Sequence, residues 1–183
     1  MTIERMPGPE VVLMCGIAGS GKTTYSRRLE EAGYIRLSID EAVWAQFGRY
    51  GLDYAAADYG DKSRLADGAL RQRVRFLIRQ GNRVVVDNSF WSRAIRDEYK
   101  ELVTASGGQW RLVYLQATPE RLRRRLEDRA QRFDANAAFP HHRRAARRLH
   151  QRLRRAAWRG RNNDSYRRRR RGHRIDHRGT VEG

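Results

Sequence analysis

Short apolar runs alternate with longer amphipathic stretches along most of this 183-residue chain. The runs suit buried strands of a parallel sheet, and the stretches carry apolar residues at helical spacing. The expected strands are residues 11–15, 34–40, 83–88 and 110–115, and the expected helices are residues 22–32, 41–47, 61–80, 89–106 and 119–132. Strands that alternate with helices predict an α/β fold: a three-layer sandwich with a central parallel sheet flanked by helices.

The ends of these elements predict where polar side chains gather. Right-handed crossovers place the carboxyl ends of all parallel strands on one edge of the sheet. Residues 50–60, which are aromatic, acidic and interrupted by glycines, are expected to form a mobile loop near that edge. Residues that follow the strands are therefore the first candidates for a site.

The loop after the first expected strand, Gly16-Ile17-Ala18-Gly19-Ser20-Gly21-Lys22-Thr23, fits the pattern G-x-x-x-x-G-K-[ST]. Its glycines let backbone N–H groups turn inward around phosphate oxygens, where side chains would obstruct them. Lys22 is placed to reach the β- and γ-phosphates, and the Thr23 hydroxyl to bind Mg²⁺. The strand before the loop and the helix after it are what this motif requires, so we expect a nucleoside triphosphate and Mg²⁺ to bind here. The expected nucleotide-binding residues are Gly16, Ala18, Gly19, Ser20, Gly21, Lys22, Thr23 and Thr24.

Two carboxylates follow other expected strands. Asp40 ends the second strand, where it can orient an acceptor hydroxyl and take its proton. The alternative for Asp40 is a cap of the following helix, and one carboxylate can serve both roles. Asp87 ends a run of three valines in the manner of a Walker B acid, which holds Mg²⁺ directly or through water. The alternative for Asp87 is a turn residue paired with Asn88.

Together, the phosphate loop, the ending Ser38-Ile39-Asp40, the ending Val86-Asp87-Asn88 and the arginine-rich stretch after residue 119 resemble a family of small P-loop kinases. This group includes zeta toxins, chloramphenicol phosphotransferase and the kinase domains of polynucleotide kinases. The resemblance covers roughly residues 9–140 and implies a P-loop NTPase fold. It also implies transfer of the γ-phosphate of ATP to a hydroxyl of a small molecule or of a nucleic-acid end, with Asp40 as the base.

The resemblance further implies that the arginine-rich helix near residues 119–132 acts as a lid. In related kinases such a helix supplies arginines that neutralise charge on the transferring phosphate, and guanidinium groups suit phosphate oxygens. Arg125, Arg129 and Arg132 share one helical face. We expect Arg125 and Arg129 to act in catalysis; most of the other arginines are expected to form a solvated face.

The net charge of +18 is concentrated near the carboxyl-terminal end. Residues 1–139 hold 23 Lys+Arg and 18 Asp+Glu, a net +5, whereas residues 140–183 hold 16 and 3, a net +13. We therefore expect a kinase-like domain over residues 1–139 and a poorly ordered arginine-rich tail over residues 140–183. One interpretation of the tail is a basic arm that binds nucleic acid on a P-loop protein with little transfer activity. The other is a shifted reading frame, because codons read one base later can encode acidic peptides at residues 141–147 and 157–161.

Other classes of protein find little support in the sequence. No apolar run approaches the length of a membrane span, and residues 1–7 lack a signal-peptide pattern, so we expect a cytoplasmic protein without membrane contact. The single cysteine, Cys15, lies in the first expected strand. It is expected to be a small core residue rather than a reactive thiol.

A basic arm predicts DNA binding that weakens steeply with salt, because each phosphate contact releases counterions. We expect this steep slope for residues 1–183 and its loss for residues 1–139, measured as the dissociation constant of a DNA duplex across salt concentrations. Equal slopes for the two proteins would contradict a binding arm. Sequencing the coding DNA tests the other interpretation, since codons that do not permit the two acidic peptides exclude a shifted frame.

Overall fold

Four strands form a parallel sheet in the order β2-β3-β1-β4. The strands are β1 (Glu10–Cys15), β2 (Ile35–Ser38), β3 (Val84–Asp87) and β4 (Gln109–Tyr114). The structure is a computed structural model and describes residues 8–130. The predicted α/β class with a central parallel sheet is confirmed.

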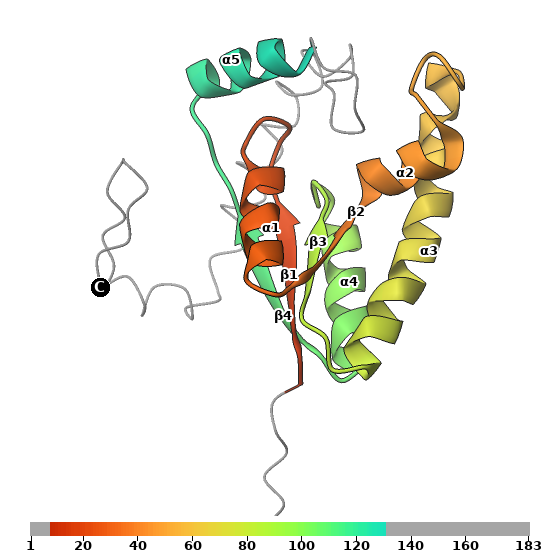
Figure 1. The fold of residues 1–183 in the computed structure, drawn as a ribbon, viewed down its shortest axis with the longest axis vertical. Coiled ribbons are helices and arrows are strands. Elements are labelled where there is room, and N and C mark those ends of the chain that lie inside the picture. The colour runs from red at the N-terminus through yellow and green to blue at the C-terminus, as the bar shows by residue number, and fades with distance from the viewer. Residues whose placement is uncertain (1–7, 131–183) are drawn as a thin grey trace, which may run out of the picture.

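Helices cover both faces of this sheet (Figure 1). They are α1 (Lys22–Glu31), α2 (Ile39–Phe47), α3 (Tyr59–Arg79), α4 (Arg93–Ala105) and α5 (Pro119–Ala130), with a short 3₁₀ turn η1 at Ala56–Asp58. Helix α1 lies on one face, and α3 and α4 lie on the other. Helix α5 lies beyond the carboxyl ends of the strands, at the same edge as the loop between β1 and α1. The predicted three layers are therefore present.

The two central strands are buried on both faces, which explains their continuous apolar runs. Between the sheet and helices α3 and α4, the core includes Leu13, Val86 and Tyr99, each 0% exposed. Between the sheet and α1, a smaller cluster contains Val12 and Val85. This packing holds the carboxyl ends of β1 and β3 side by side at the centre of the edge that carries the phosphate loop.

Several element boundaries differ from the sequence prediction by one or more residues, and two of these differences have a clear structural cause. Strand β2 ends at Ser38, because the Ser38 hydroxyl caps α2 by accepting a hydrogen bond from the Glu41 backbone N–H at 3.4 Å. Helix α4 begins at Arg93 rather than at residue 89, because Phe90 has a φ of 43°, which a right-handed helix cannot contain. The Phe90 ring is buried and packs edge-on against Tyr99, with ring centroids 4.8 Å apart. The positive φ of Phe90 therefore occurs at a residue whose aromatic ring is buried in the core.

The loop expected at residues 50–60 holds an aromatic cluster. The Tyr50 ring packs edge-on against Tyr54 and Tyr59, with centroid distances of 6.1 and 5.7 Å. The helix predicted near residues 119–132 is present as α5, whereas Arg132 and the tail at residues 140–183 lie outside the described residues. Within residues 8–130, no helix combines the length and apolar character needed to cross a membrane.

Candidate nucleotide-binding site

The loop between β1 and α1 is anchored by the segments that follow the two neighbouring strands. Gly16 donates its N–H to the Ser89 carbonyl after β3 at 3.1 Å, and Leu115 after β4 donates to the Cys15 carbonyl at 2.8 Å. A Cβ on Gly16 would lie 2.6 Å from the Leu115 carbonyl oxygen and 2.7 Å from the Ser20 Oγ, and its φ is +148°. Only glycine fits this position without a shift of its surroundings.

Polar groups inside the loop suit an anionic ligand. The Lys22 ammonium donates hydrogen bonds to the carbonyl oxygens of Gly16 at 2.9 Å and Ile17 at 3.1 Å, so it lies folded over the loop. The Ser20 hydroxyl is buried and has no hydrogen-bond partner among the described residues. The N-cap of α1 is Gly21, which has no side chain to accept from the first-turn N–H groups. Such a cradle fits phosphate oxygens.

Asp87 lies beside the start of α1 and is 5% exposed. Burial raises the pKa of its carboxyl group, while the Lys22 charge, a hydrogen bond with Thr23 and the Arg36 charge act in the opposite direction. The Thr23 hydroxyl and the Asp87 carboxylate are hard oxygen donors, which fit Mg²⁺. Across residues 8–130 no group of three or more His, Cys, Asp or Glu side chains is arranged to hold a metal. A Mg²⁺ ion at this pair would therefore use phosphate oxygens and water as further ligands, as this ion commonly does.

Asp40 lies in the first turn of α2 rather than at the end of a strand. Ser38, two residues earlier, pairs in register with Asp87, so both carboxylates follow neighbouring strand ends. The Tyr59 hydroxyl donates a hydrogen bond to Asp40 Oδ1 at 3.1 Å. Burial raises the pKa of Tyr59, which keeps the phenol protonated as a donor. The interpretation of Asp40 as the helix cap is wrong, because Ser38 occupies the N-cap position and caps the helix.

Helix α5 packs over the phosphate loop. Arg125 Nη1 donates a hydrogen bond to the Gly19 carbonyl oxygen at 3.0 Å. Leu122 and Leu126 lie 3.4 and 3.6 Å from the position that a Cβ on Gly19 would take, and Leu122 belongs to the core. Arg125 is thus brought to the loop, while the side chain of Arg129 lies outside what the structure describes.

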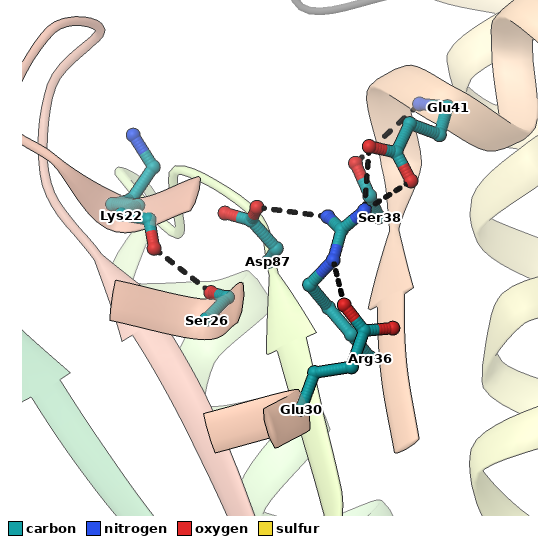
Figure 2. Close-up of polar contacts among 7 residues, drawn as sticks. All are labelled: Lys22, Ser26, Glu30, Arg36, Ser38, Glu41 and Asp87. Carbon is teal, nitrogen blue, oxygen red and sulfur yellow. Dashed lines mark hydrogen bonds and ion pairs between the residues drawn. The ribbon is translucent and has the colours of Figure 1, made fainter. Parts of the chain in front are cut away.

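Arg36 is a residue of this site that the sequence analysis missed. Its side chain is 8% exposed and forms ion pairs with Asp87 at 3.2 Å, Glu41 at 2.5 Å and Glu30 at 3.4 Å (Figure 2). The sequence feature that could have identified Arg36 is the presence of a charged residue inside an expected strand. Strand alternation places Arg36 on the α1 face of the sheet, whereas Ile35 and Leu37 pack into the opposite core.

Cys15 is buried, as expected of a core residue, and its thiol donates to the Phe90 carbonyl oxygen at 3.4 Å. Burial raises the pKa of this thiol, which disfavours the reactive thiolate.

The parallel sheet, the phosphate loop and the carboxylate on the adjacent strand define a P-loop kinase-like domain. The chain belongs to the AAA domain family, which matches residues 11–156. No curated protein matches the sequence. The family resemblance inferred from the motifs is confirmed.

Solved structures share this fold at low sequence identity. A chain of the Pnkp1/Rnl/Hen1 RNA repair complex is 18% identical with a TM-score of 0.62, over 81% of this chain and 47% of that chain. This chain therefore spans about half the length of that protein. A candidate kinase from Chloroflexus aurantiacus is 20% identical with a TM-score of 0.61, over 73% and 75% of the two chains. Kti12 from Chaetomium thermophilum, solved with ADP-AlF3, is 16% identical with a TM-score of 0.52, over 78% and 79%.

We expect Gly16→Ala to destabilise the protein by about 1–3 kcal/mol, because its φ is unfavourable for alanine and its Cβ would overlap the Leu115 carbonyl. Urea unfolding without nucleotide measures this change. Gly68→Ala is the matched control: Gly68 lies within α3 with nothing within 4 Å of its added Cβ. That substitution should stabilise by roughly 0.5–1 kcal/mol. Equal stability of Gly16→Ala and wild type would contradict the tight packing of the loop.

Proposed function

We propose that this chain is an ATP-dependent kinase that transfers the γ-phosphate to a hydroxyl of a small molecule or of a nucleic-acid end. The observation that carries this proposal is the placement of Asp87 beside Thr23 at the start of α1, with Lys22 folded over the same loop. A nucleotide-binding loop needs only the cradle. A carboxylate on the adjacent strand adds the means to hold a metal against the phosphates.

In this proposal the phosphate loop binds the nucleotide. Backbone N–H groups surround the phosphates, and Lys22 exchanges its two carbonyl acceptors for phosphate oxygens, which make stronger charge-assisted hydrogen bonds. Ser20, whose hydroxyl lacks a partner within the described structure, gains one. The full set of proposed nucleotide-binding residues is Gly16, Ala18, Gly19, Ser20, Gly21, Lys22, Thr23 and Thr24.

Thr23 and Asp87 would hold Mg²⁺, directly or through water. When bound, this ion neutralises charge on the β- and γ-phosphate oxygens. The burial of Asp87 suits this task, since a carboxylate shielded from solvent attracts a cation more strongly than an exposed one.

Asp40 is the proposed general base. The acceptor hydroxyl donates a hydrogen bond to the Asp40 carboxylate and transfers its proton there as its oxygen attacks the γ-phosphorus and ADP leaves. The hydrogen bond from Tyr59 fixes one carboxylate oxygen, which limits the orientations of the base.

Arg125 and Arg129 are the proposed lid arginines. Arg125 contacts a neutral carbonyl of the loop, Gly19, so a short movement of its guanidinium would bring it to a phosphate oxygen. Guanidinium groups stabilise the charge that develops on the transferring group. Structural neighbours that include a candidate kinase support the class of reaction through the shared fold.

The experiment that tests the proposed function is a transfer screen with ATP labelled on its γ-phosphate. The acceptors are oligonucleotides with 5′-hydroxyl ends, nucleosides, sugars and hydroxylated antibiotics. Label on any acceptor, dependent on Mg²⁺, supports the kinase. Tight ATP binding without transfer to any of these classes would favour a nucleotide-binding protein without kinase activity.

We expect Lys22→Ala to weaken ATP binding by about 10–100-fold, the effect of losing hydrogen bonds from a charged group. Isothermal titration calorimetry measures the affinity, and circular dichroism checks the fold. Lys100→Ala is the control, because Lys100 lies on α4 and pairs with Asp97. The proposed role of Lys22 is wrong if both variants bind ATP as tightly as wild type.

We expect Asp40→Asn to keep ATP affinity and to lower the transfer rate by about 10²–10⁴-fold, the usual effect of losing a general base. Asp87→Asn should instead weaken ATP binding in the presence of Mg²⁺, because an amide is a poorer metal ligand than a carboxylate. Both are measured at saturating Mg²⁺, by calorimetry and by transfer to the acceptor found in the screen. A wild-type transfer rate for Asp40→Asn would show that another residue is the general base, with Asp53 and Asp58 as the next candidates.

A further inference from the structure

Arg36 places a cation in the layer between the sheet and α1. Its side chain is only 8% exposed, although it lies on a four-residue strand at the edge of the described sheet. A buried guanidinium is costly unless its donors are paired. The carboxylates that pair with Arg36 are therefore held close to its guanidinium group.

The partners of Arg36 are three carboxylates from three different elements. Nη1 donates to Asp87 Oδ2 at 3.2 Å, and Nη2 donates to the two Glu41 oxygens at 2.6 and 2.5 Å. Nε lies 3.4 Å from Glu30 Oε2 in an ion pair whose geometry is too poor for a hydrogen bond. These partners come from the end of β3, the first turn of α2 and the last turn of α1.

Two of these contacts concern residues with proposed roles. Arg36 occupies one oxygen of Asp87, and the other oxygen is directed toward the side where Lys22 lies (Figure 2). Glu41 directly follows Asp40, so the contact between Glu41 and Arg36 also holds the turn of α2 that carries the proposed base. A single guanidinium thus links the candidate metal ligand to the segment that bears the candidate base.

We propose that Arg36 is a positioning residue of the kinase site, which orients the Asp87 carboxylate toward the phosphate loop and holds the first turn of α2 through Glu41. This inference rests on the proposed function, because it assigns Arg36 a task in Mg²⁺-dependent nucleotide binding. Partners that orient a metal ligand have effects of this kind, and their loss typically costs 10–100-fold in metal affinity or activity. The planar fork of arginine is essential, since a lysine ammonium is a point charge without fixed donor directions.

The test compares Arg36→Lys with Arg71→Lys. Arg71 is a matched control because it also pairs with two carboxylates, Asp67 at 2.6 Å and Glu98 at 2.8 Å. It links α3 to α4 on the opposite face of the sheet. Calorimetry with a non-hydrolysable ATP analogue gives the affinity in Mg²⁺ and in EDTA, and the ratio of the two affinities is the Mg²⁺ enhancement.

We expect Arg36→Lys to reduce the Mg²⁺ enhancement by about 10-fold or more while leaving the affinity in EDTA unchanged. Arg71→Lys should leave both affinities unchanged. An unchanged enhancement in folded Arg36→Lys would overturn the proposal, as would an equal loss with and without Mg²⁺. An increased enhancement would also overturn it, since Arg36 would then act only as a charge that repels the ion.

A second measurement follows the α2 contact. We expect backbone amides of residues 39–44 to exchange with deuterium faster in Arg36→Lys and in Glu41→Gln than in wild type, because the tether to α2 is weakened. Amides of α4 should be unaffected. If Arg36→Lys does not fold, Glu41→Gln decides: unchanged exchange in the first turn of α2 overturns the positioning role.

Wild-type protein separates this inference from the proposed function. If wild type shows no Mg²⁺ enhancement of analogue binding, the proposed function fails and Arg36 has nothing to position. If wild type shows the enhancement and Arg36→Lys retains it, the inference alone fails.

Discussion

The burial of the Asp87 carboxylate is the constraint on which the rest of the site depends. A buried charge without partners costs several kcal/mol, so the surrounding elements must supply compensation. They do so from two elements: Lys22 and Thr23 lie at the start of α1, and Arg36 lies on β2. The same charge therefore connects the phosphate loop, the central strand and the edge strand. In the proposed function, a carboxylate held in this way is suited to bind Mg²⁺.

Two cationic side chains form hydrogen bonds with backbone carbonyl oxygens of the phosphate loop. Lys22 donates to the Gly16 and Ile17 carbonyls, and Arg125 donates to the Gly19 carbonyl. Neutral carbonyls are weaker acceptors than ionised phosphates, so in the proposed function both cations form stronger hydrogen bonds when phosphate oxygens replace the carbonyls. The backbone at Gly16 is confined by the Leu115 carbonyl and by the segment that follows β3. These contacts hold the loop in the cradle shape that the proposed function requires.

The helix over the loop combines an apolar anchor with a basic surface. Leu122 packs into the core near Gly19, while Arg125 reaches the loop from the next turn of α5. Helical spacing places both residues on the side of α5 that faces the loop. The side chain that anchors α5 in the core is therefore distinct from the one that contacts the phosphate loop through a hydrogen bond.

The sequence by itself determined the succession of strands and helices along the chain, because this depends on local periodicity. It also determined the phosphate loop, whose motif acts through its backbone, and the carboxylates that follow the strands. It could not distinguish Ser38 from Asp40 as the helix cap, since both residue types cap well. It also could not anticipate the left-handed Phe90, which depends on packing against Tyr99. Only the tertiary structure decided that β3 lies beside β1, and with it the contacts of Arg36 with Asp87 and of Arg125 with Gly19, 51 and 106 residues apart. The physical reason is that strand order and register arise from the packing of the whole sheet, which no local pattern encodes.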